Sequence, residues 1–107
     1  MAEILIQIPP ESLPWETTEL DALWSRLEAW IDETLEENGL GRCVNVDFSS
    51  ELSAWAQVAD DERALAALTA ALPRSGLPAT TVLAERRADG YAIRWPPERA
   101  SEHLDPF

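Results

Sequence analysis

The chain has 107 residues, a formal net charge of −12 and no lysine, which predicts one domain with a single hydrophobic core. The negative charge argues against nucleic-acid binding, because phosphate contacts need Lys and Arg, and no apolar run reaches the ~20 residues of a membrane span. Cys43 is the chain's one cysteine, which excludes an internal disulfide and fits a reducing compartment. No basic residue precedes the first apolar run, so the sequence predicts a cytoplasmic protein without a signal peptide.

The N-terminal third predicts a strand followed by a long helix. Residues 4–8 alternate as a strand with Ile4, Ile6 and Ile8 on one face, and two prolines end it. A helix is expected over 18–38, with Thr18 as its cap and Asp21 completing a capping box. Its buried stripe is expected to contain Leu20, Trp24, Leu27, Ile31 and Leu35, and Asn38-Gly39 to end it.

Two further strands are expected next. In the strand over 42–49, Val44, Val46 and Phe48 point one way, and Cys43, Asn45 and Asp47 point the other. Residues 52–58 predict a weaker strand, although their small side chains also allow a helix. As a strand, this segment places Trp55 on the sheet face away from the helices.

The C-terminal half predicts a helix and a hairpin. Asp60 or Asp61 caps the helix, Pro73 ends it, and its stripe contains Leu65, Leu68 and Leu72. Runs over 80–87 and 91–95 flank Asp89-Gly90, which is typical of a two-residue type I′ turn. That register places Ala88 opposite Tyr91 and Glu85 opposite Arg94.

The element order β-α-β-(β)-α-β-β predicts an α+β fold. We expect a ferredoxin-like two-layer sandwich, with two helices on one face of a mostly antiparallel sheet. Residues 1–97 are expected to form the domain. Residues 98–107 lack periodicity and predict a C-terminal tail that is frayed or packed loosely by Leu104 and Phe107.

Negative charge is concentrated in the N-terminal part of the chain, where residues 1–41 hold ten of the twenty acids but only one Arg. The predicted helix carries one row of acids, Asp21, Glu28, Asp32 and Glu36, and a second flank with Glu19, Glu33 and Glu37. Like charges four residues apart cost roughly 0.2–0.5 kcal/mol per pair. Anions near a helix C-terminus cost about 0.3–1 kcal/mol each. These acids therefore indicate either a docking ridge for a basic partner or a solvated face that the helix tolerates.

The sheet face away from the helices is a second candidate, since Asp47 and Trp55 are expected there. An exposed Trp beside acids is typical of an interface anchor, whereas a buried Trp55 would be part of the core. Trp15 is the other expected anchor.

The sequence contains few of the residues that catalytic sites commonly use. His103 and Cys43 are the lone His and Cys and have no partner at a catalytic spacing. The run Asp60-Asp61-Glu62 is better explained by helix capping than by metal binding. No P-loop, dinucleotide or zinc pattern occurs, so the sequence predicts a protein that is not an enzyme, without metal or cofactor.

The run 41–48, the helix start Asp60-Asp61-Glu62-Arg63, and the Asp89-Gly90-Tyr91 and Trp95-Pro96 segments resemble small acidic bacterial α/β proteins of uncharacterised or toxin-immunity type. The resemblance covers the whole chain in element order. The chain departs from it in lacking a glycine-rich stretch near residues 47–53. The resemblance implies a small cytoplasmic protein that binds its toxin tightly, and it assigns no functional residue.

The sequence thus favours a non-enzymatic acidic protein-binding module, such as an immunity or inhibitor protein, that covers a basic partner surface. One alternative is an acidic secretion-chaperone or adaptor-like protein that dimerises through an apolar helix face. The other is an enzyme that uses acids on the open sheet face. The expected partner-binding residues are Asp21, Glu28, Asp32, Glu33, Glu36, Glu37, Asp47 and Trp55, and the oligomeric state stays open.

Overall fold

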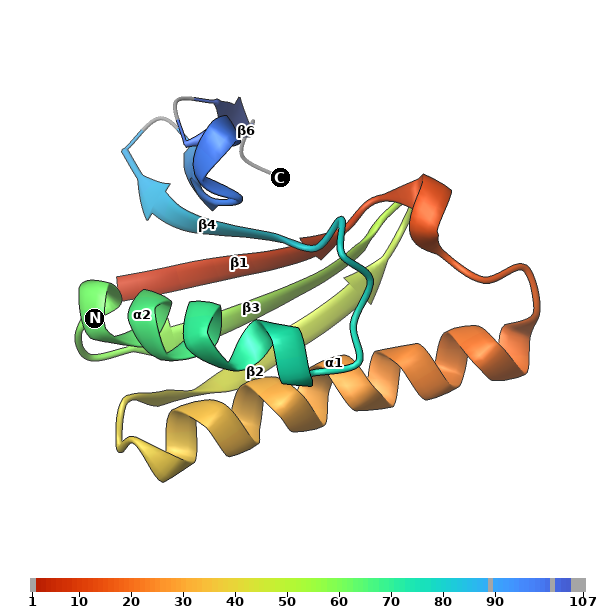
Figure 1. The fold of residues 1–107 in the computed structure, drawn as a ribbon, viewed down its shortest axis with the longest axis horizontal. Coiled ribbons are helices and arrows are strands. Elements are labelled where there is room, and N and C mark those ends of the chain that lie inside the picture. Colours follow the sequence, from red (N-terminus) through yellow and green to blue (C-terminus); the bar gives the residue numbers. More distant parts are fainter. Residues whose placement is uncertain (1, 89, 101, 105–107) are drawn as a thin grey trace.

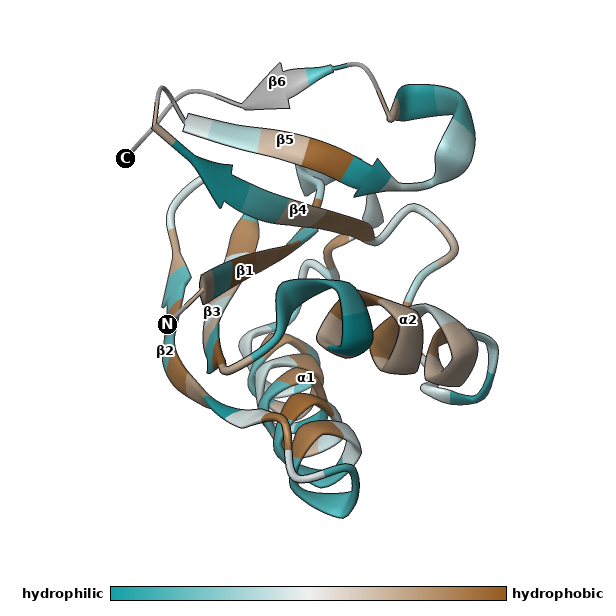
Figure 2. Cartoon of the chain, turned by 90° about the vertical axis from the view of Figure 1, so that its left-hand side faces the viewer, coloured by the Kyte–Doolittle hydropathy of each residue, from teal (hydrophilic) through white to brown (hydrophobic). Residues whose placement is uncertain are grey.

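The computed structural model describes residues 2–88, 90–100 and 102–104. Two helices pack on an antiparallel sheet of order β2-β3-β1-β4-β5 (Figures 1 and 2), which confirms the α+β class. The strands are β1 (Ala2–Ile8), β2 (Gly41–Phe48), β3 (Leu52–Val58), β4 (Val82–Arg87) and β5 (Gly90–Trp95), and the helices are α1 (Thr17–Glu37) and α2 (Asp61–Ala71). No helix in the described part of the chain is long and apolar enough to cross a membrane.

The main core lies between the sheet and the helices, which both lie on the same side of β1 and β3 (Figure 2). Ile4, Ile6 and Ile8 of β1 are fully buried there, as the alternation predicted. They meet the apolar stripe of α1, whose fully buried members include Leu27 and Ile31. A second, smaller cluster lies on the other sheet face and contains Leu5, Val82, Ala84, Tyr91 and Ile93.

Helix α1 begins one residue earlier than expected, and the predicted Thr18 cap is wrong. The N-cap residue is Glu16, which makes no side-chain capping bond, and Thr18 therefore lies in the first turn. The predicted end is confirmed. The Asn38 amide donates to Thr34 O at 2.7 Å, and Gly39 adopts a φ of +62° that favours glycine.

Strand β2 lies at the edge of the sheet and contains a bulge that the alternation did not predict. Cys43 pairs with Ala56 and Asn45 pairs with Trp55, so Val44 is an extra residue. The predicted facing was therefore wrong for Cys43, which packs against the main core, and for Val44, which is 42% exposed.

The segment 52–58 is a strand, as the sequence favoured, and not a helix. Leu52, Ala54, Ala56 and Val58 are all buried against the helices. Trp55 therefore lies on the opposite face.

The hairpin forms, but its predicted register was wrong. Tyr91 pairs with Arg86 instead of Ala88, and Glu85 lies opposite Ala92. The reason is that Gly90 pairs with Arg87 as the first residue of β5, at a φ of +138°.

Part of the predicted C-terminal tail contacts β5. The Ile93 N–H donates to Glu102 O at 3.0 Å, and the two-residue strand β6 (His103–Leu104) pairs with β5. The predicted packing role of Phe107 lies outside the described residues.

Candidate functional site

The acids of α1 are exposed and are not compensated by Arg. Asp21, Glu28, Glu33, Glu36 and Glu37 are all exposed, and Asp32 is half-buried. Among the described residues, no ion pair involves an acid of α1. The last turn of the helix holds no basic residue, so its carboxylates face the negative end of the helix dipole.

The described Arg residues that form ion pairs meet acids elsewhere in the chain. Arg86 pairs with Glu3, and Arg99 pairs with Glu102. Arg87 and Arg94 both pair with Glu85. On α1 itself, Arg26 donates to the carbonyl of Gly76 at 3.4 Å. Helix α1, with seven acids and one Arg, therefore carries half of the net charge of −12.

Asp32 is hydrogen-bonded to the edge strand β2, and this bond shows on which side of α1 the first acid row lies. Its Oδ1 accepts a hydrogen bond of 2.8 Å from the Cys43 N–H of β2. Because Asp21 and Glu28 share the helix row of Asp32, the row lies on the β2 side of α1.

Cys43 packs beside this row and is half-buried. Burial, together with the nearby carboxylates of Asp32 and Glu28, raises the pKa of the Cys43 thiol to about 11. The thiol is therefore protonated at neutral pH, which is the opposite of what a nucleophilic cysteine needs.

Asp47 is exposed on β2, and its Oδ1 accepts from the Phe48 N–H at 2.9 Å. Two N–H groups of the edge strand, those of Cys43 and Phe48, are thus occupied by carboxylates. An incoming strand needs free donors along a sheet edge. Two of the acids that the sequence assigned to partner binding therefore make these two donors unavailable to an incoming strand.

Trp55 faces away from the helices, as expected for a strand, but it is half-buried against the second cluster. It packs beside Leu5 and Tyr91 and so presents less apolar surface than an exposed anchor would.

The same sheet face carries a small polar group around Glu3. The Tyr91 hydroxyl donates to Glu3 Oε1 at 2.5 Å, and Arg86 donates to the same oxygen at 3.3 Å. Burial raises the pKa of Tyr91, and the hydrogen bond to Glu3 raises it further. The neighbouring hollow of about 240 Å³ contains one acid, Glu3.

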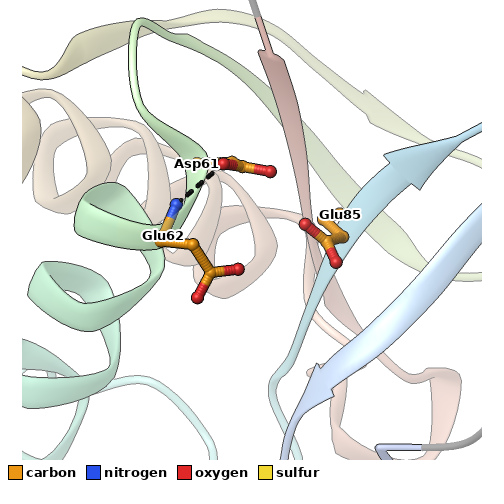
Figure 3. Close-up of side chains that lie close together, drawn as sticks. All are labelled: Asp61, Glu62 and Glu85. Atoms are coloured by element: carbon orange, nitrogen blue, oxygen red, sulfur yellow. Dashed lines mark hydrogen bonds between the residues drawn. The ribbon is translucent and has the colours of Figure 1, made fainter.

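A third acidic group joins α2 to the hairpin (Figure 3). Carboxylate oxygens of Asp61, Glu62 and Glu85 lie within 4.8 Å of one another. Arg94 Nη1 lies 2.8 Å from Glu62 Oε1 and 2.7 Å from Glu85 Oε1. The Arg94 guanidinium holds the pKa of Glu62 below its usual value. Arg94 and Arg87 already neutralise Glu62 and Glu85, so these residues form an ion-pair network that fastens α2 to β4 and β5.

Asp60 accepts from the Arg63 N–H at 3.2 Å and so caps α2, as predicted. The run of acids at this helix start therefore serves the helix and the ion-pair network.

The most exposed apolar surface was only partly anticipated. Trp15 is fully exposed, Val44 is 42% exposed and Phe48 is 39% exposed. Phe48 faces the helices as predicted, but β2 is an edge strand and the helices cover this side chain only in part.

No family model, curated protein or solved structure matches this chain.

Proposed function

We propose that this chain is a non-enzymatic, acidic protein-binding module that covers a basic surface of its partner, in the manner of an immunity or inhibitor protein. The observation that carries the proposal is the uncompensated charge of α1. Its exposed acids lie outside every described ion pair, while four Arg residues neutralise acids elsewhere. A surface of one charge sign speeds the encounter with a partner of the opposite sign.

The proposed docking surface differs slightly from the set that the sequence suggested. Asp32 and Asp47 bind N–H groups of β2, so their primary role is structural. The surface consists of the exposed acids Asp21, Glu28, Glu33, Glu36 and Glu37.

We also propose that β1 to β4 and the two helices form the ferredoxin-like arrangement, extended by β5 and β6. The element order β1-α1-β2-β3-α2-β4 and the neighbour order β2-β3-β1-β4 support this assignment.

The alternatives lack an observation of comparable weight. An adaptor that dimerises through a helix needs an apolar helix face, but the apolar stripes of α1 and α2 lie against the sheet. An enzyme working on the open sheet face needs acids gathered in a pocket. There, Glu3 is held by Tyr91 and Arg86, and Asp47 is held by its own strand.

Affinity capture from an extract of the native host tests the proposal through a comparison of variants. The bait is the wild-type protein, the variant Glu36→Gln/Glu37→Gln, or the control Glu98→Gln/Glu102→Gln. The control changes the net charge equally but away from α1, and the exposed Glu102–Arg99 pair that it removes contributes little stability.

We expect a basic protein to be retained by the wild type and the control, and to be lost from the α1 variant and at high salt. Equal retention of that protein by all three baits would contradict the proposal. Recovery of no basic protein would also contradict it.

A further inference from the structure

A hollow of about 400 Å³ opens where the segment between β1 and α1 passes the end of β2. Its apolar walls are Pro10, Leu13, Pro14, Trp15 and Phe48. Ile8 and Phe48 both pair with Leu52, so the two sides of the hollow meet at one end of the sheet (Figure 1).

The hollow contains the most exposed aromatic surface described in this chain. Trp15 is fully exposed, and Phe48 is 39% exposed. Leu13, which also lines the hollow, is half-buried and packs against the main core, so this wall is attached to the folded domain. Large aromatic side chains left in solvent beside a concave apolar wall are typical of an interaction site.

The charged residue among the described residues that line the hollow is an acid, Glu11. The chain that continues from the lining residue Trp15 into α1 contains Glu16, Glu19 and Asp21 before its first Arg. The other side contains Phe48 and Ser50, and the acids Asp47 and Glu51 adjoin them in the chain. The hollow is therefore complementary to an apolar group that is flanked by positive charge.

The first acid row of α1 leads away from this hollow. Asp32 contacts Cys43 on β2, so the row of Asp21, Glu28 and Asp32 lies on the side of α1 that faces the edge strand. Phe48 lies further along the same strand. From Asp21 to Asp32 the row extends about 16 Å along the helix, which is a suitable length for a short segment of a partner.

We propose that the hollow receives one apolar side chain of a basic polypeptide segment, whose Lys or Arg residues lie along Asp21 and Glu28. This inference rests on the proposed function and adds the binding mode. The segment docks through its side chains and not as an added strand, because carboxylates occupy the Cys43 and Phe48 N–H groups of the edge. A second copy of this chain does not fit, because it would bring a net charge of −12 to an acidic rim.

Short synthetic peptides serve as probes of this mode. The first alternates Lys and Gly around a central Leu, the second has Ala in place of that Leu, and the third keeps Leu but has Glu in place of Lys. The full chain is labelled with fluorotryptophan, and the ¹⁹F resonance of Trp15 is assigned by its loss from the Trp15→Phe variant. Binding is measured by titration at low salt.

We expect the basic Leu peptide to shift the Trp15 resonance and to bind roughly tenfold more tightly than the Ala peptide, because it buries an additional apolar side chain. Trp15→Ala should lower its affinity to that of the Ala peptide. The matched control Val44→Ala removes an exposed apolar side chain outside the hollow and should leave the affinity unchanged.

Two results separate this inference from the proposed function. If both basic peptides bind equally and the Trp15 resonance stays in place, the hollow is not the receptor, although the acidic surface still binds positive charge. If neither basic peptide binds more tightly than the Glu peptide, both proposals fail. A wild-type dimer that Trp15→Ala converts to a monomer would also overturn the inference, since the occupant would then be a second copy.

Discussion

Asp32 shows how an acid that a charge pattern assigns to a partner can belong to the fold. On sequence grounds it is one member of a row on α1. In the structure its carboxylate accepts from the Cys43 N–H beside the β2 bulge, where the regular ladder is interrupted. The sequence could predict the row from helical spacing. It could not predict the bond, which depends on where the bulge places a backbone donor.

Replacement of Asp32 by Ala should lower the free energy of unfolding by about 1–3 kcal/mol, because the Cys43 N–H loses a charged acceptor. The control is Glu28→Ala in the same row. Glu28 is exposed, and we expect its removal to change stability by less than about 0.5 kcal/mol. Urea unfolding monitored by circular dichroism measures both values, and equal effects would contradict the structural role of Asp32.

Cys43 should be a slow nucleophile. Its pKa is raised to about 11, so the reactive thiolate is rarer in the folded protein than at the ordinary pKa of ~8.5. We expect the rate of alkylation by iodoacetamide to continue to rise with pH up to about pH 11. In urea the rate should level off near the ordinary value. A plateau below pH 9 in the folded protein, at rates like those in urea, would contradict this environment for the thiol.

At the scale of elements, periodicity predicted both helices and five strands, because each element buries one face whose spacing is visible in the sequence. The bulges at Val44 and Arg94 and the hairpin register were not predictable in this way, since they depend on pairing with a neighbouring strand. The sequence likewise predicted only part of the apolar hollow. Trp15 was a candidate anchor from the sequence, but Phe48 was assigned to the interior because alternation does not reveal that β2 is an edge.

Gly41 of β2 lies against the backbone of β3 with no room for a side chain. A Cβ atom at this position would lie 2.1 Å from the backbone oxygen of Gln57, and backbone atoms cannot move aside easily. We expect Gly41→Ala to destabilise the fold by roughly 1–3 kcal/mol. The control, Gly39→Ala, meets no neighbouring atom within 4 Å, and its penalty should come only from the positive φ. Thermal unfolding measures the stability of both variants. A Gly41→Ala variant that melts at the wild-type temperature would contradict this account.

The end of α1 should gain stability when its acids are neutralised. Glu33, Glu36 and Glu37 lie near the negative end of the helix dipole, with no basic residue in the last turn. The triple variant Glu33→Gln/Glu36→Gln/Glu37→Gln should therefore melt higher, by roughly 4–8 °C for each kcal/mol gained. A lower melting temperature, measured by calorimetry at low salt, would show that these acids support the fold.

At the scale of the whole molecule, one set of exposed acids and the exposed apolar hollow lie at the same helix, α1. The described ion pairs join Arg residues mainly to acids of the sheet and α2, and the acids of α1 other than Asp32 are exposed to solvent. The exposed hollow opens at the N-terminal end of the same helix. A chain selected only for solubility could carry its acids anywhere, whereas a steering surface requires them on one side.

The most direct test of this account is the association rate constant of the basic partner as a function of ionic strength. For the wild type we expect a steep fall as salt is added. For Glu33→Gln/Glu36→Gln/Glu37→Gln we expect a slower rate at low salt and a flatter dependence. If the triple variant associates at the wild-type rate with the wild-type salt dependence, the acids of α1 do not guide a partner and the central claim is wrong.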